Sequence, residues 1–255
     1  MTFNPLDFPI CLEAPRRIKL MNWQPHVPFA FFLVAAIKPR VIVELGTHFG
    51  DSYCAFCQAV KTAELTTRCY AVDTWKGDEN SGTYGPEVLA DLRTHHDPLY
   101  SEFSTLIQKT FDEAVQYFED GSIDILHVDG CHLYPAVKHD LEKWLPKVSA
   151  RGVVLIHDIA VYGGDFGVWK LWNELEARYP HFAFNFGSGL GVLGIGAEFP
   201  EAVGALFRAD ELETLSIQQF FRTIGIRVGS GSNDLLSPLT EWADTAKSQI
   251  HTIHE

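Results

Sequence analysis

Residues 41–52 read VIVELGTHFGDS, a short apolar run rich in β-branched residues and followed by two glycines four positions apart. The run VIVEL is typical of a buried strand in a parallel sheet, which has both faces covered. Gly46 and Gly50 would let the backbone turn sharply and approach a ligand, and the helix predicted for residues 52–63 would begin with unpaired N–H groups. The stretch therefore predicts a strand, a ligand-binding turn and a helix.

The same alternation of strands and helices continues along the chain. Further buried strands are predicted at residues 69–72, 104–108, 123–128 and 153–156. Helices are predicted at residues 87–93, 111–118, 134–145 and 166–177. Two last strands, at residues 182–186 and 191–195, are joined by the hairpin-like turn Gly187-Ser188-Gly189. We therefore predict an α/β fold with a doubly wound, Rossmann-like sheet of seven strands that ends in an antiparallel hairpin.

The length of 255 residues suits one large domain with extensions at both ends. We assign residues 1–198 to the α/β domain, with residues 1–40 as a helical lead-in, and residues 199–255 to a helical C-terminal appendage. Residues 76–100 form a long insertion that contains Gly, Pro and His, and loops of this length are usually functional lids or disordered. Its residues Tyr84, His95 and His96 could line an acceptor pocket, but they are interpreted as exposed loop residues.

Composition excludes several function classes. The formal net charge is −13 and no run of Lys and Arg is present, which argues against a nucleic-acid partner. The apolar run at residues 28–37 is too short to cross a bilayer, and no signal-peptide pattern is visible. Five cysteines, an odd and low number, fit reduced thiols. We expect a cytoplasmic protein with no membrane association, and a homo-oligomer is compatible with the sequence.

Polar residues occur near the ends of the first two predicted strands. Glu44 lies within an otherwise apolar strand, where a buried carboxylate needs partners. Asp73 ends the second strand, about where an acidic side chain can accept hydrogen bonds from the ribose hydroxyls of an adenosine. The glycine spacing differs from the G-x-G-x-x-G of dinucleotide dehydrogenases, so it suits a ligand without a pyrophosphate.

A second polar cluster lies in residues 126–140, LHVDGCHLYPAVKHD. Asp129 and Asp158 end the fourth and fifth strands, which are neighbours in a doubly wound sheet, so both carboxylates should project at its carboxyl edge. Adjacent strands are about 5 Å apart, close enough for two carboxylates to share a divalent cation. Oxygen ligands favour Mg²⁺ or Mn²⁺. His132 would face the same crevice, whereas His127 is predicted to lie in the core.

These residues resemble the motifs of class I S-adenosylmethionine (SAM)-dependent methyltransferases. The matching positions are Glu44, Gly46, Thr47, Gly50 and Ser52 in the glycine-rich first motif, Asp73 at the ribose-binding acid, and Thr110 on the adenine side. Residues 129–132, 140–146, 151–158 and 189–193, with Asp73-Thr74-Trp75, are similar to a bacterial family related to sugar O-methyltransferases of macrolide tailoring. This similarity covers about residues 23–196.

The resemblance implies SAM as cofactor and a hydroxyl of a sugar or another small-molecule or glycan acceptor as the methylated group. It implies that Thr74, Trp75 and Asp129 also belong to the cofactor site. In the macrolide enzymes, acids at the ends of strands four and five hold a metal ion, and a His three positions after the first acid is the base. Asp129 and His132 are therefore the implied catalytic residues. Asp129 and Asp158 are the implied metal ligands, with His157 where those enzymes carry another acid.

Two other functions remain open at this point. A nicotinamide-dependent oxidoreductase could use a similar sheet, although the missing G-x-G-x-x-G argues against it. A non-catalytic SAM-binding module associated with glycosyltransferases is the other alternative, and it would leave the set Asp129, His132 and Asp158 unexplained.

Overall fold

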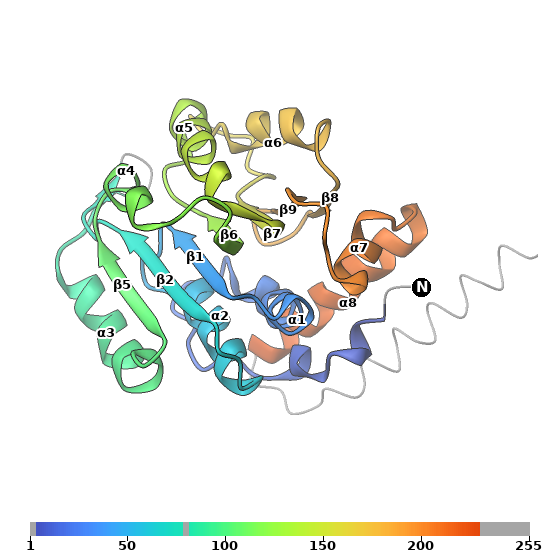
Figure 1. The fold of residues 1–255 in the computed structure, drawn as a ribbon, viewed down its shortest axis with the longest axis horizontal. Coiled ribbons are helices and arrows are strands. Elements are labelled where there is room, and N and C mark those ends of the chain that lie inside the picture. The colour runs from blue at the N-terminus through green and yellow to red at the C-terminus, as the bar shows by residue number, and fades with distance from the viewer. Residues whose placement is uncertain (1–3, 79–81, 230–255) are drawn as a thin grey trace, which may run out of the picture.

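A central sheet of seven strands organises the computed structural model, which describes residues 4–78 and 82–229 (Figure 1). The strands lie in the order β5-β2-β1-β6-β7-β9-β8. The first five strands in this order are parallel to one another, and β9 runs antiparallel to both of its neighbours, β7 and β8. The strands are β1 (Val41–Leu45), β2 (Arg68–Asp73), β5 (Ser104–Gln108), β6 (Ile123–Val128), β7 (Val148–His157), β8 (His181–Phe184) and β9 (Leu190–Gly194). The predicted doubly wound sheet with a terminal antiparallel hairpin is confirmed.

Helices cover both faces of this sheet, as expected for buried strands (Figure 1). One apolar cluster joins the sheet to α1 (Val27–Ile37), α2 (Asp51–Thr62), α3 (Glu87–Tyr100), α7 (Glu201–Phe207) and α8 (Glu211–Gly229). The other joins it to α4 (Phe111–Ala114), α5 (Tyr134–Trp144) and α6 (Val168–Glu176). Short 3-10 turns are η1 (Pro5–Asp7), η2 (Pro9–Leu12), η3 (Gln24–His26), η4 (Val115–Tyr117) and η5 (Leu145–Lys147).

Helix α3 begins where the helix at residues 87–93 was predicted, but it runs further and corrects the interpretation of residues 76–100 as a long loop. A small hairpin, β3 (Gly77–Asp78) with β4 (Gly82–Thr83), is followed by a helix that runs to Tyr100 and contains Pro98. The buried residues of this helix recur every four positions, at Val88, Leu92, His96 and Tyr100. Packing of this face outweighs the cost of a proline near the end of the helix. His96 is therefore buried rather than exposed in a loop.

The helices after residue 198 pack against the N-terminal part of the chain. Phe221 of α8 makes ring contacts with Phe29 and Phe32 of α1, and the close approach of Gly225 to Pro25 leaves no room for a Cβ atom. α7 and α8 therefore complete one face of the core. The predicted domain boundary at residue 198 stays a prediction, and residues 230–255 of the appendage lie outside the described residues. None of the described helices is long and apolar enough to cross a membrane.

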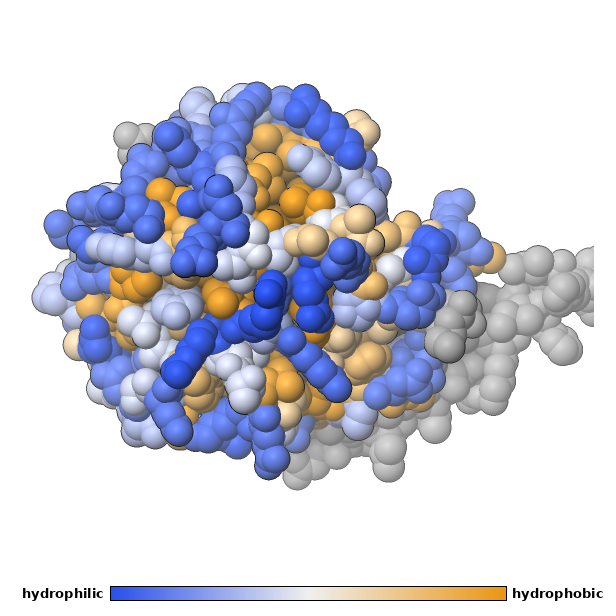
Figure 2. Space-filling model, viewed as in Figure 1, coloured by the Kyte–Doolittle hydropathy of each residue, from blue (hydrophilic) through white to orange (hydrophobic). Residues whose placement is uncertain are grey.

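On the face seen in Figure 2, hydrophilic residues cover much of the surface, and separate areas of hydrophobic residues lie between them.

A buried carboxylate ties β1 to β6 and β7. Asp124 of β6 is fully buried and accepts hydrogen bonds from the backbone N–H of Arg40 (2.8 Å), the Arg40 guanidinium (2.9 and 3.0 Å) and the Ser149 hydroxyl (2.6 Å). Burial alone would raise the pKa of Asp124, but these hydrogen bonds outweigh it and hold the pKa below its usual value. Asp124 thus contributes stability above its unfolded pKa, and this contribution is lost as pH falls through the lower folded pKa.

Asp124→Asn should lower the free energy of unfolding by about 2–4 kcal/mol, because an amide places a donor among donors and removes a buried charge. Urea denaturation at neutral pH measures the change. The matched control is Asp120→Asn, which removes an exposed partner of Lys147 and should change stability by no more than about 0.5 kcal/mol. Equal effects of the two substitutions would contradict this role of Asp124.

Candidate active site

A cavity of about 550 Å³ opens at the carboxyl edge of the sheet, where β1, β2, β6 and β7 end. Most of the predicted site residues line it: Gly46, Thr47, Gly50, Ser52, Asp73, Thr74, Thr110, Asp129, His132, His157 and Asp158. Two others, Glu44 and Trp75, do not line it and lie behind its wall. The structure thus brings the predicted cofactor residues and the predicted catalytic residues to one cavity.

The part of the cavity that holds the predicted cofactor residues is built around the carboxylate of Asp73. Its Oδ2 accepts hydrogen bonds from the backbone N–H groups of Thr47 (2.9 Å) and His48 (2.8 Å), and its Oδ1 accepts one from Trp75 (2.7 Å). A carboxylate has about four acceptor positions, so Oδ1 keeps one for a ligand. Asp73 therefore shapes the turn after β1 as well as facing the cavity.

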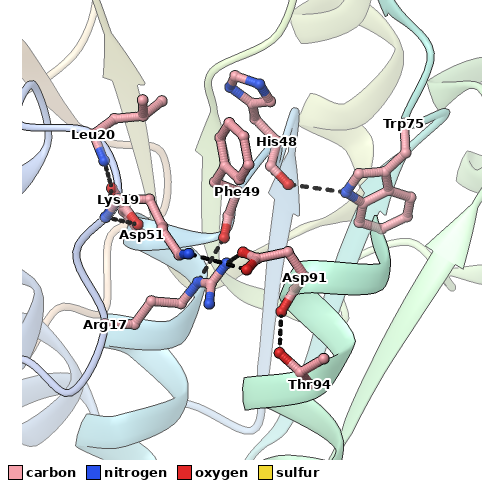
Figure 3. A network of polar contacts seen from close by, with 9 residues as sticks. All are labelled: Arg17, Lys19, Leu20, His48, Phe49, Asp51, Trp75, Asp91 and Thr94. Carbon is pink, nitrogen blue, oxygen red and sulfur yellow. Dashed lines mark hydrogen bonds and ion pairs between the residues drawn. The ribbon is translucent and has the colours of Figure 1, made fainter. Parts of the chain in front are cut away.

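The carbonyl groups of the same turn are also held (Figure 3). The indole Nε1–H of Trp75 donates to the carbonyl of His48 (3.0 Å), and the guanidinium Nε–H of Arg17 donates to that of Phe49 (2.8 Å). His48 (φ 48°) and Trp75 (φ 50°) adopt left-handed backbone conformations, which are strained for residues with side chains. Such strain persists only where the surroundings fix it and often occurs at functional sites.

Gly46 is required by close contact between two strand ends. Its φ is 86°, and a Cβ atom there would lie 2.1 Å from the carbonyl oxygen of Asp129. The glycine thus lets the turn after β1 touch the end of β6, and the two halves of the site meet at this point.

The part of the cavity that holds the predicted catalytic residues contains two carboxylates and two imidazoles. Nε2 of His132 lies 2.8 Å from Asp158 Oδ2 and 3.7 Å from Asp129 Oδ1. Nδ1 of His157 lies 3.3 Å from Asp129 Oδ1 and 3.5 Å from Asp158 Oδ2, while its Nε2 lies 3.0 Å from the Gly187 carbonyl. Stacking on Phe166, at 4.6 Å and 8°, also fixes the ring of His132. The backbone of Asp158 adopts a left-handed conformation (φ 61°).

The charges in this cluster balance when both imidazoles are protonated. Burial alone would lower the pKa of each ring, but hydrogen bonds and charge from Asp129 and Asp158 outweigh it. They raise the pKa of His132 to about 9 and that of His157 to about 10. Conversely, the imidazoles outweigh the effect of burial on the acids, and they hold the pKa of Asp129 well below its usual value and that of Asp158 below it.

The donor atoms of the cluster also fit a metal ion. Oxygen or nitrogen atoms of Asp129, His132 and Asp158 lie within 4.8 Å of one another. Nδ1 of His157 faces the same acids, and its other nitrogen can donate to a backbone carbonyl, as the second nitrogen of a metal-bound His usually does. Carboxylate and imidazole donors suit a divalent ion.

Glu44 and His127 form a buried pair behind this cluster. Both side chains are fully buried, and Nδ1 of His127 lies 2.8 Å from Glu44 Oε2. Burial raises the pKa of Glu44 against the opposing effect of His127, and the Ser52 hydroxyl also hydrogen-bonds to it. The core position predicted for His127 is confirmed. Glu44 therefore supports the turn through Ser52 rather than from the cavity wall.

Thr110 combines a structural contact with a place in the cavity wall. Its hydroxyl accepts a hydrogen bond from the N–H of Glu113 (3.2 Å) and forms the capping box of α4. This cap fixes the beginning of α4, which follows β5 at the edge of the cavity.

Sequence reasoning missed several lining residues: some lie beside the predicted residues in the glycine turn and after β6, and others come from segments far from them in the chain. They are Leu20, Asn22, Trp23, His48, Phe49, Asp51, Gly77, Phe111, Asp112, Gly130, Cys131, Ala136 and Asp140. Tyr84, interpreted as an exposed loop residue, stacks on His48 at 4.6 Å. Their spacing in sequence carries no periodic signal that would have identified them.

A family model described as a methyltransferase domain matches residues 43–159. Over 186 residues the chain is 50% identical to the uncharacterized protein y4gI of Sinorhizobium fredii (strain NBRC 101917 / NGR234), and the match covers 73% of this chain and 20% of that protein. The chain thus spans about a fifth of the length of this curated relative.

Two solved structures are similar in fold. The SAH-bound methyltransferase PaMTH1 of Podospora anserina has a TM-score of 0.51 at 15% identity, with 66% of this chain and 77% of that chain covered. The O-methyltransferase TomG of Streptomyces achromogenes, in complex with SAM, has a TM-score of 0.51 at 12% identity, with 71% and 92% covered.

NMR titration of the ligand-free protein should give midpoints of about 9 for His132 and about 10 for His157. Because these folded-state values exceed the unfolded value of about 6.5, the stability they contribute is complete below that pH. It is lost as pH rises toward the folded values. Asp158→Asn should lower both midpoints. Midpoints near the unfolded value in the unsubstituted protein would contradict the charge balance described above.

Proposed function

We propose that the chain, whose residues 43–159 match a methyltransferase domain model, transfers the methyl group of SAM to a hydroxyl of a sugar or glycosylated small molecule. The observation that carries this proposal is the single cavity shared by the Asp73-bound turn and by His132 with its two acids. Cofactor and acceptor must meet in one place, and this cavity offers groups for both.

Unused polar atoms support SAM as the ligand of the Asp73 half. Oδ1 of Asp73 keeps an acceptor position suited to a ribose hydroxyl. The hydroxyl of Thr47 is buried, belongs to a residue that lines the cavity, and has no hydrogen-bond partner among the described residues. Buried polar groups normally have partners, so a ligand that hydrogen-bonds to Thr47 would remove this deficit.

The charge of the cavity fits a cationic cofactor and an uncharged acceptor. Among its lining residues there is no Lys or Arg, and six are aspartates: Asp51, Asp73, Asp112, Asp129, Asp140 and Asp158. Protonated His132 and His157 balance Asp129 and Asp158, and the other four aspartates leave a negative field, which attracts the sulfonium group of SAM and repels phosphorylated or carboxylated acceptors. A sugar hydroxyl is compatible with this field.

His132 is the group that we assign as the base. As the acceptor oxygen attacks the methyl carbon, the bond from that carbon to sulfur breaks, SAH is left, and the hydroxyl proton passes to the imidazole. His132 must be neutral to accept it, whereas in the ligand-free protein its pKa is raised to about 9. Positive charge placed next to Asp129 and Asp158 lowers the pKa of His132, so that the ring loses its proton and can act as the base.

Asp129 and Asp158 would hold a divalent ion such as Mg²⁺ or Mn²⁺, with His157 as the nearest further donor. When bound, such an ion supplies Lewis-acid stabilisation of a deprotonated hydroxyl. The cluster could also hold an ion through His132, and a ligand cannot serve as the base at the same time. In our proposal His132 accepts the proton, and Asp129 and Asp158 would bind the ion.

Calorimetric titration with SAH tests the cofactor assignment. The unsubstituted protein should bind SAH, and Asp73→Asn should weaken binding about 10- to 100-fold, because charge-assisted hydrogen bonds to the turn and the ligand are lost. Asp120→Asn, on an exposed carboxylate, should leave the affinity unchanged. NAD⁺ should give no heat. Binding of NAD⁺ without binding of SAH would instead favour the oxidoreductase alternative.

His132→Ala should retain SAH affinity and lose at least about 100-fold in turnover, the usual contribution of a general base. Turnover is measured as SAH formed from SAM with a panel of uncharged glycosides, with and without EDTA.

Mn²⁺ affinity, measured by electron paramagnetic resonance, should stay unchanged in His132→Ala and fall in Asp158→Ala. Unchanged turnover in His132→Ala would remove His132 from the mechanism, and a loss of Mn²⁺ affinity would make it a ligand instead.

A further inference from the structure

Residues 16–23 have no regular secondary structure, with bends at residues 16 and 19–23, and their last part reaches the cavity; we call this segment the strap. The strap lies outside residues 43–159, the part that matches the methyltransferase domain model. Three of its residues, Leu20, Asn22 and Trp23, line the cavity. The strap is thus a part of the site that the shared domain does not supply.

Two side chains of α2 hold the strap in place. The buried carboxylate of Asp51 accepts hydrogen bonds from the backbone N–H groups of Lys19 (2.9 Å to each oxygen) and Leu20 (2.6 Å). The Gln58 amide accepts from the N–H of Arg16 (2.8 Å) and donates to the carbonyl of Ala14 (2.9 Å). Because α2 begins directly after Gly50, these contacts fix the strap relative to the cofactor turn.

Arg17 links the strap to the turn itself (Figure 3). Its side chain is only 5% exposed, and its guanidinium is paired with Asp91 of α3 while Nε–H donates to the Phe49 carbonyl at 2.8 Å. Lys19 also reaches Asp91 (2.9 Å), and both cations hold the pKa of Asp91 below its usual value. A buried guanidinium is costly unless it is fully paired. The ion pair with Asp91 alone does not explain why the Arg17 guanidinium also binds a carbonyl of the turn.

The reason lies in how the turn is held. Its N–H groups at Thr47 and His48 are bound by Asp73, and its carbonyl at His48 is bound by Trp75. Arg17 binds the next carbonyl, that of Phe49. Leu92 of α3 packs closely against the end of the turn: a Cβ atom at Gly50 would lie only 2.5 Å from its Cδ1 atom. Arg17 and α3 therefore support the half of the turn that Asp73 and Trp75 do not reach.

We propose that Arg17, fixed by Asp91, is a positioning residue for SAM: by holding the Phe49 carbonyl it keeps the Thr47–Gly50 turn in its cofactor-binding shape. The inference rests on the proposed function, since it assumes that this turn binds SAM. It also assigns part of the cofactor affinity to a segment outside the shared domain. Arg17 is not a catalytic residue, because its contacts are with Phe49 and Asp91 rather than with the cavity.

SAH affinity and local hydrogen exchange of the full chain test the proposal. Arg17→Ala should weaken SAH binding about tenfold or more and speed amide exchange at residues 47–50, while exchange in β6 stays unchanged. Arg17→Lys should recover the thermal stability through its pair with Asp91 but not the SAH affinity, because a lysine lacks the planar fork that bridges Asp91 and the Phe49 carbonyl. Asp91→Asn, a milder change at a partly exposed residue, should weaken SAH binding severalfold.

The matched control is Arg93→Ala, which breaks an exposed ion pair with Asp97 on the same helix and should leave SAH affinity unchanged. Unchanged SAH affinity in both Arg17→Ala and Asp91→Asn would overturn the proposal, as would recovery of affinity in Arg17→Lys together with stability. If the unsubstituted protein does not bind SAH, the proposed function falls and this inference falls with it. The two failures are therefore distinguishable.

Discussion

The hydrogen bonds from the Thr47 and His48 N–H groups to the carboxylate of Asp73 are the interaction on which the site depends. They join the ends of two neighbouring strands, β1 and β2, and turn the backbone after Gly46 against the end of β6. A carboxylate that accepts several backbone N–H bonds holds them more firmly than a neutral group does. The same residue then presents its remaining acceptor position to the cavity. Support of the turn and binding of a ligand are therefore coupled through one side chain.

Charge balance is the second constraint on the site. Asp129 and Asp158 lie beside each other in a partly buried place, and such a pair needs positive charge nearby. In the ligand-free protein the protons of His132 and His157 provide it, which is why the pKa values of both rings are raised. A sulfonium cofactor or a divalent ion would provide positive charge in another form. Binding and proton release are linked in this site, as the proposed role of His132 requires.

Much of this arrangement could be predicted from the sequence. The strand rhythm, Gly46, Asp73, Asp129 and Asp158 gave the sheet and its functional edge, because parallel strands align their carboxyl ends. Contacts that depend on packing could not be predicted. His96 was placed in a loop, although the buried face of α3 continues past Pro98. Arg17 carries no motif, and only the folded chain brings it to Phe49.

A crystal structure of the protein with SAH and Mn²⁺ would test most directly whether this cavity is the site of methyl transfer. We predict that the adenosine lies between Asp73 and Thr110, and that the SAH sulfur faces the cluster of Asp129, His132 and Asp158. We also predict that Mn²⁺ lies on the two acids with His132 unligated. SAH bound elsewhere, or with its sulfur turned away from His132, would contradict the proposed function.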